Sequence, residues 1–124
     1  MNITVNEQEQ RFYLAAKKWE PVVGHEIKIG EYRFCAIPTE DGINVSEVSS
    51  GAKVTVFPMN LKNSLLAQTK KDSMKIFNKI GESIKRIIEK QSDFDAQLEK
   101  LKQTAFDRLG KMPPIVDVDV KAEG

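Results

Sequence analysis

The sequence predicts an α+β fold with a short N-terminal helix, an antiparallel β-meander of three or four strands, a long C-terminal amphipathic helix and a short terminal strand. Three observations predict it. Apolar residues recur at helical spacing in residues 7–19, alternate in residues 26–57 and return to helical spacing in residues 72–109. Turn-forming residues punctuate the alternating part, and neither Gly nor Pro occurs in residues 82–109.

The N-terminal helix is expected over residues 7–19, after a short leading strand in residues 1–5. Asn6 suits the N-cap position, and Pro21 ends the helix because proline disfavours a helical conformation in the residue before it. The apolar face follows the spacing i, i+3, i+4 and i+7, and its members are Phe12, Ala15, Ala16 and Trp19.

The meander is expected to consist of strands at 26–29, 32–37, 43–48 and 53–57. Their connections are short and contain glycine, so neighbouring strands should be antiparallel. Residues 113–120 begin with two prolines and then alternate valine with aspartate, which predicts a strand that adds to a sheet edge. Three acceptors remain open for that strand: the chain's own meander, a second subunit or a different protein.

The chain divides by charge and pattern into three parts that we expect to form one structural domain. Residues 1–60 hold the first helix and the meander, residues 61–112 are helical and coiled-coil-like, and residues 113–124 are a tail. The net charge of the whole chain is +1, but residues 61–112 alone carry twelve Lys and Arg against seven Asp and Glu. The basic character therefore belongs to the helical part.

The helical part has two alternative interpretations. A single helix over residues 72–109 would be about 57 Å long, which exceeds the roughly 35 Å diameter of a compact chain of this size. Such a helix would project and bury its apolar stripe against another copy. Alternatively, the helix breaks at Gln91–Ser92, with Ser92 as the N-cap of a second helix. Because the apolar stripe keeps its phase through this point, we expect the continuous helix.

That stripe is a heptad seam, and it carries the leading functional hypothesis. Large apolar residues at a and d positions are typical of coiled coils, although the same stripe would also serve to cover the meander within one subunit. We expect a small non-enzymatic protein, an adaptor or inhibitor-like regulator, that forms a homo-oligomer and binds another protein. Small cofactor-free proteins of this type are common among the accessory proteins of phages and mobile elements. The predicted interface is Phe77, Ile80, Ile84, Ile87, Phe94, Leu98 and Leu101.

An alternative function is nucleic-acid binding through the basic side of the same helical region. Lysine and arginine side chains in a row can follow a phosphate backbone, but acidic residues interrupt this row and no aromatic residue accompanies it, as on an ordinary solvated helix face. The candidate contacts are Lys71, Lys75, Lys79, Lys85, Arg86 and Lys90.

The sequence predicts no enzyme, no catalytic residue, no cofactor and no metal site. It has no glycine-rich phosphate loop and no paired metal-binding cysteines, and its only histidine, His25, has no evident partner. Asp117 and Asp119 offer too few oxygen ligands for a cation. Cys35, the only cysteine, is expected to be buried and inert and indicates a reducing, cytoplasmic setting. No apolar run is long enough to span a membrane, so we expect no membrane partner.

Overall fold

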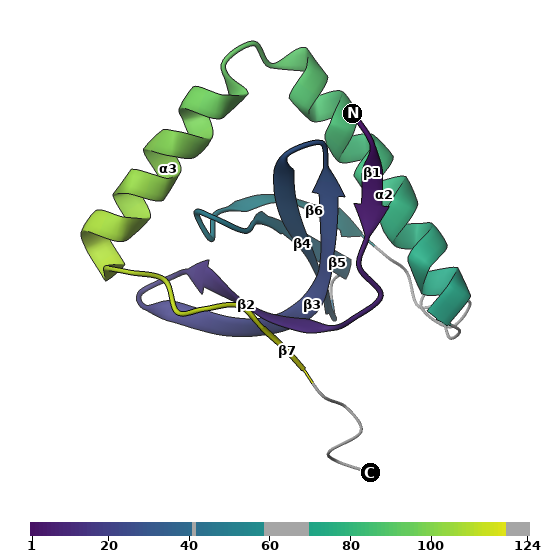
Figure 1. Ribbon diagram of the computed structural model, residues 1–124, viewed down its shortest axis with the longest axis horizontal. Coiled ribbons are helices and arrows are strands. Elements are labelled where there is room, and N and C mark those ends of the chain that lie inside the picture. The colour runs from purple at the N-terminus through teal and green to yellow at the C-terminus, as the bar shows by residue number, and fades with distance from the viewer. Residues whose placement is uncertain (41, 59–69, 119–124) are drawn as a thin grey trace.

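The computed structural model describes residues 1–40, 42–58 and 70–118, and strands dominate its architecture (Figure 1). Within these residues, seven strands form one antiparallel sheet in the order β6-β5-β4-β3-β2-β7, and β1 also pairs with β3. Two helices, α2 (Lys70–Lys90) and α3 (Phe94–Leu109), follow β6. The strands are β1 (Ile3–Val5), β2 (Gln10–Ala15), β3 (Trp19–Ile29), β4 (Tyr32–Thr39), β5 (Gly42–Glu47), β6 (Lys53–Pro58) and β7 (Val116–Asp117).

Strand β3 is shared between two parts of the sheet. Its first part, Trp19–Gly24, pairs with β2, whereas its second part, His25–Ile29, pairs with β4 and, over its last three residues, with β1. Gly24 lies at the changeover, where a Cβ atom would stand 2.2 Å from the carbonyl oxygen of Ala36. Only a residue without a side chain lets β3 pass this close to the backbone of β4.

Both faces of β4 are buried, so the protein has two apolar cores. Phe34 and Ala36 point into the larger core, which α2 covers. Cys35 and Ile37 point to the opposite face, because side chains alternate along a strand. There they meet Phe12 of β2 and other apolar residues of the curled sheet, and Ile115, just before β7, packs against this second core.

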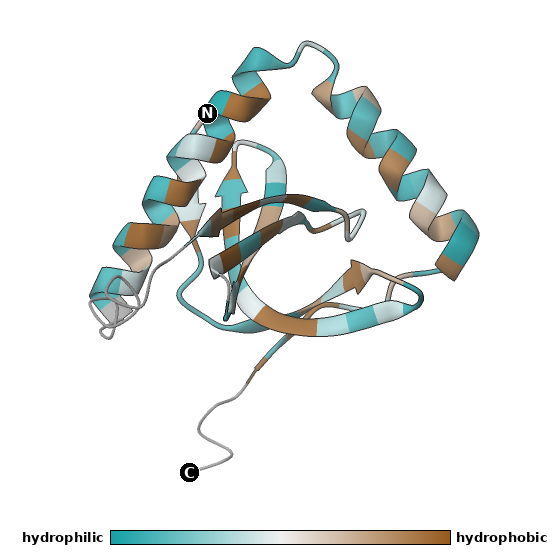
Figure 2. Cartoon of the chain, turned by 180° about the vertical axis from the view of Figure 1, so that it is seen from behind, coloured by the Kyte–Doolittle hydropathy of each residue, from teal (hydrophilic) through white to brown (hydrophobic). Residues whose placement is uncertain are grey.

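Helix α2 packs on β1 and β3 through one apolar face. Its buried residues are spaced at three and four positions, as expected for an amphipathic helix, and they are Phe77, Ile80, Ile84 and Ile88. Gly81 allows a close approach, since a Cβ there would lie 2.7 Å from Cγ2 of Ile3. The two helices then diverge from their connection, with the sheet between them, and polar and apolar residues alternate along both (Figures 1 and 2).

The predicted fold class is wrong, because the protein is strand-dominated and has no helix at residues 7–19. Those residues form β2, a turn at 16–18 and the start of β3. Asn6 does use its side chain locally, but its Oδ1 accepts a hydrogen bond from the backbone N–H of Gln8 in a turn. The helical spacing of apolar residues is outweighed by the six residue pairs that β2 forms with β3.

Pro21 shows how a proline fits in this hairpin. It lies opposite Tyr13 in the β2–β3 pairing. Ala15 donates its backbone N–H to the carbonyl of Gly51, away from β3. Because hydrogen-bonding directions alternate along a strand, Tyr13 also points its backbone groups away from β3. Pro21 therefore needs no N–H at this position.

The expected continuous helix over residues 72–109 is also wrong. The chain turns after Lys90, and Asp93, not Ser92, occupies the N-cap position of α3 without a side-chain capping bond. Both helices turn apolar residues toward the same core, so the stripe keeps its phase although the helix does not continue. The four expected meander strands are present as the second part of β3 and as β4, β5 and β6, within the larger sheet.

The terminal strand is shorter than expected and belongs to the chain's own sheet. Val116 pairs with Arg11 and Asp117 with Gln10, so β7 lies on the free edge of β2. The backbone N–H of Val118 extends this pairing by donating to the carbonyl of Glu9. The rest of the expected strand, residues 119–120, lies outside the described residues.

Replacing Gly24 by alanine should destabilise the protein by at least about 2 kcal/mol, because the new Cβ would overlap the carbonyl of Ala36 and force β3 away from β4. Chemical denaturation of the variant and the parent measures the difference. A change within about 0.5 kcal/mol would show that β3 tolerates a side chain at the changeover.

Ile84→Lys should unfold the domain, because Ile84 is fully buried among residues of the sheet and would be replaced by a charge with no partner. Glu82→Lys is the matched control, since it places the same residue on the exposed face of α2. Circular dichroism melts should show loss of the cooperative transition for the first variant and little change for the second. A folded Ile84→Lys variant would contradict the packing of α2.

Candidate functional site

Helix α3 covers the sheet much less completely than α2 does. Of its 16 residues, only Phe94 near the start and Ala105 near the end are buried. Leu101 and Phe106 retain 46% and 56% of their accessible surface, which makes them the two exposed large apolar residues of the helix. Specific contacts with the sheet occur mainly at the two ends of α3.

The N-terminal end of α3 is attached by aromatic residues. The ring of Phe94 meets Tyr32 edge-to-face at a centroid distance of 5.1 Å and lies 6.4 Å from the ring of Phe34. The hydroxyl of Tyr32 donates a hydrogen bond to the carboxylate of Asp95, and this bond raises the pKa of Tyr32. An apolar contact and a polar contact therefore hold the same turn of helix against the start of β4.

The C-terminal end of α3 is attached to the turn between β2 and β3 by hydrogen bonds. Arg108 donates from Nη1 to the carbonyl oxygen of Ala16 at 3.1 Å. The indole Nε1 of Trp19 donates to the carbonyl oxygen of Gly110 at 3.3 Å. These two bonds fix the point at which the chain leaves the helix and returns toward β7.

A cleft lies beside α3 between these attachments. It consists of two adjoining pockets of about 480 and 420 Å³, both of which include Ser49 and Met112. Aromatic and aliphatic side chains supply half of its lining residues, and polar and charged residues supply most of the others. We call it the α3 cleft, and its apolar lining residues are Trp19, Tyr32, Val48, Leu98, Phe106, Met112, Pro113, Pro114 and Ile115.

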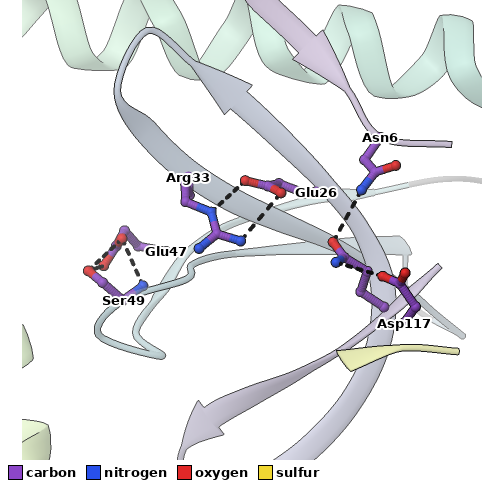
Figure 3. A network of polar contacts seen from close by, with 7 residues as sticks. Asn6, Glu26, Arg33, Glu47, Ser49 and Asp117 are labelled. Atoms are coloured by element: carbon purple, nitrogen blue, oxygen red, sulfur yellow. Dashed lines mark hydrogen bonds and ion pairs between the residues drawn. The ribbon is translucent and has the colours of Figure 1, made fainter. Parts of the chain in front are cut away.

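The floor of the α3 cleft contains a buried carboxylate that stabilises a turn. Glu47 is 4% exposed, and its oxygens accept hydrogen bonds from the backbone N–H and the hydroxyl of Ser49 (Figure 3). They also accept one from the backbone N–H of Ser50. Nearby, Arg33 binds Glu26 through an ion pair of 2.6 Å between Nε and Oε2. Because the turn itself occupies both oxygens of Glu47, this carboxylate has a structural role.

The single histidine is also held in a structural interaction. Nδ1 of His25 lies 2.9 Å from the carbonyl oxygen of Asn6, and a carbonyl can only accept, so Nδ1 carries the proton. The ring of His25 lies 5.1 Å from that of Phe77 on α2. These contacts orient the imidazole for packing between the sheet and the helix.

Cys35 is 1% exposed in the second core, as the sequence predicted. Burial raises the pKa of its thiol to about 12. Asp117 accepts a hydrogen bond from Gln10 in the network with Asn6 (Figure 3), whereas Asp119 lies outside the described residues. Among the residues that the structure describes, no three His, Cys, Asp or Glu side chains are grouped as metal ligands.

The predicted oligomer seam is divided between the core and the surface. Phe77, Ile80, Ile84 and Phe94 are buried in the larger core, and Ile87 and Leu98 are partly buried against it. Leu101 is the one exposed member of the seam. Self-association stays a prediction, but the part of the seam that is available to a partner is the part on α3.

Of the residues that line the α3 cleft, only Leu98 is a predicted interface residue, and Trp19 and Phe106 are among those that the sequence does not indicate. Trp19 was assigned to a helix that does not exist, and Phe106 falls outside the heptad positions. No local signal distinguishes them, because they line the same pocket only where the end of α3 meets the start of β3. The candidate nucleic-acid contacts, in contrast, all lie on α2, where Lys85 is partly buried and Lys71, Lys75, Lys79, Arg86 and Lys90 are exposed.

Cys35 should react with a thiol reagent very slowly in the folded protein and quickly in denaturant. At pH 8 a pKa of about 12 in place of the usual 9.0 leaves about a thousandfold less thiolate, and burial further limits access. Stopped-flow or manual thiol titration with and without guanidinium measures the ratio. Similar rates under both conditions would contradict the burial of Cys35.

Comparisons with known proteins do not identify a function: no family model matches the chain, and no curated protein and no solved structure matches it. Neither of the two described helices is long and apolar enough to cross a membrane. The functional argument therefore rests on the geometry of α3 and the α3 cleft.

Proposed function

We propose that the protein is a non-enzymatic protein-interaction protein, an adaptor or regulator, that self-associates through α3. The observation that carries this proposal is the exposure of two large apolar residues of α3: Phe106, which lines the α3 cleft, and Leu101, which lies about 140° away around the helix. Exposed apolar side chains that are grouped with a hollow and rimmed by charged residues are typical of protein-binding surfaces.

The geometry supports a weak contact rather than a permanent one. Complete burial of a large apolar side chain stabilises by about 1.5–3 kcal/mol, and Leu101 and Phe106 are already about half buried. A two-fold symmetric contact that reaches both sides of α3 would bury both residues from each copy and so gain about 3–6 kcal/mol, which is near the lower end of the cost of association. Additional contacts in the α3 cleft, for example with Trp19, are therefore needed, and we expect a dissociation constant of about 0.1–1 mM.

The chemically reactive side chains support a non-enzymatic role. Glu47 stabilises a turn, His25 is bonded to a backbone carbonyl, and the thiol of Cys35 is buried. None of the three is paired with a group that would make it a nucleophile or a general base. The proposal includes the reducing, cytoplasmic setting that a lone buried cysteine favours.

The proposal predicts that the mass in solution rises from monomer toward dimer as the protein concentration approaches about 500 µM. Replacing both Leu101 and Phe106 by serine should abolish this rise, because it removes the apolar groups that the contact would bury. Sedimentation equilibrium over a concentration series measures the masses of the parent and the variant.

The matched control replaces two exposed apolar residues of strands, Val23 and Val116, by serine. This variant should associate like the parent, and all three proteins should melt at similar temperatures. A parent that stays monomeric over the whole series would refute self-association through α3. Equal loss of association in both variants would place the contact elsewhere.

A further inference from the structure

The outer face of α2 presents a row of positive charge on a rigid helix. Because the apolar face of α2 is buried against β1 and β3, the opposite face is fixed toward solvent. Residues 71–90 contain six basic and three acidic residues. Five of the basic side chains are exposed, and we call them the basic face of α2: Lys71, Lys75, Lys79, Arg86 and Lys90.

The spacing of these residues places four of them in line. Lys75 and Lys79 are four residues apart, and the same step separates Arg86 from Lys90. The second pair follows the first by 11 residues, which is about three helical turns and returns to the same side of the helix. From Lys71 to Lys90 the basic face is about 28 Å long.

We propose that the basic face of α2 binds the phosphate backbone of duplex nucleic acid without sequence specificity. Lysine is a flexible point charge that contacts phosphates without reading bases. A straight row of such charges complements a rod that carries negative charge at regular intervals. The proposal is independent of self-association, because the surface lies on α2 and not on α3.

The side chains of α2 favour a duplex over other anionic partners. No large apolar side chain of α2 is exposed within residues 71–90, so the helix offers nothing to insert into a lipid bilayer or to form the apolar centre of a protein interface. Its one aromatic residue, Phe77, is buried and cannot stack on the bases of a single strand. The exposed side chains of α2 can therefore bind an anionic partner through electrostatic contact with a phosphate backbone.

The acidic neighbours of the basic face limit the affinity. Glu82 and Glu89 are exposed on the same side of α2, with Glu82 between Lys79 and Arg86 along the helix, and both would repel phosphates that approach the basic face. We therefore expect binding within the range of non-specific complexes, with a dissociation constant of about 1–100 µM at low salt. Four phosphate contacts predict that a change from about 50 to 200 mM salt weakens binding about 150-fold.

The test measures fluorescence anisotropy of a labelled 20-base-pair DNA duplex of random sequence with the full chain as the salt concentration is varied. Lys75→Gln, Lys79→Gln and Arg86→Gln are combined in one variant, which retains one of the four aligned charges. Over the same salt range its binding should weaken only about three- to fourfold, and its affinity at low salt should be at least tenfold lower than that of the parent.

A control variant removes the same number of charges from exposed lysines outside α2: Lys17→Gln, Lys18→Gln and Lys53→Gln. It should bind nearly like the parent, and thermal melts should show that both variants are folded. Absence of duplex binding by the parent at low salt would overturn the proposal, as would equal losses in the two variants. Binding of the parent to phosphatidylserine vesicles with the same dependence on Lys75, Lys79 and Arg86, at equal or higher affinity, would also overturn it in favour of a membrane surface.

Discussion

Strand β3 pairs with three other strands, and the rest of the fold depends on how its residues are divided between them. Residues 19–24 pair with β2, and residues 25–29 pair with β4 and β1. The absence of a side chain at Gly24 allows the sheet to curl at the changeover. Because the sheet curls, β2 comes to lie over the face of β4 that α2 does not cover, and two apolar cores form in a chain of 124 residues.

The two helices relate to this sheet in opposite ways. Helix α2 packs closely against the sheet, with Gly81 next to Ile3. The exposed side chains of α2 are therefore all polar or charged. Helix α3 is held at its ends by Phe94 and Arg108 and keeps apolar side chains accessible between them. The first arrangement is suited to electrostatic contacts, and the second is suited to contacts that bury apolar surface. Both follow from where each helix meets the sheet.

Sequence reasoning identified the alternating strands from 26 to 57 because local alternation and glycine turns act within a few residues. It misassigned residues 7–19 because Phe12 and Trp19 fit a helical spacing as well as a strand, and the choice depends on a pairing with distant residues. The apolar stripe favours a continuous helix because it keeps its phase through Phe94, although the helix breaks after Lys90.

The candidate site was harder to predict than the strands because it, like the pairing of β2 with β3, depends on contacts between residues that are far apart in the sequence. Leu101 was identified as an interface residue from its heptad position, and its exposure is consistent with that assignment. Trp19 begins β3, whereas Phe106 and Met112 lie near the end of α3 and just after it, and the packing of these two parts of the chain brings them together. The basic residues predicted as nucleic-acid contacts all lie on α2 and five of the six are exposed, because a helix face is a local property of the sequence, but their contact with nucleic acid stays a prediction.

Trp19 is the only tryptophan of the chain, and it lines the α3 cleft while its indole N–H binds the carbonyl of Gly110. Indole emission depends on the polarity and hydrogen bonding around the ring. When the indole is excited selectively over the two tyrosines, the fluorescence of the protein therefore originates at a single place, the junction of the cleft with the end of α3. The molecule carries its own optical reporter there, which follows occupation of the cleft or detachment of the helix without a label.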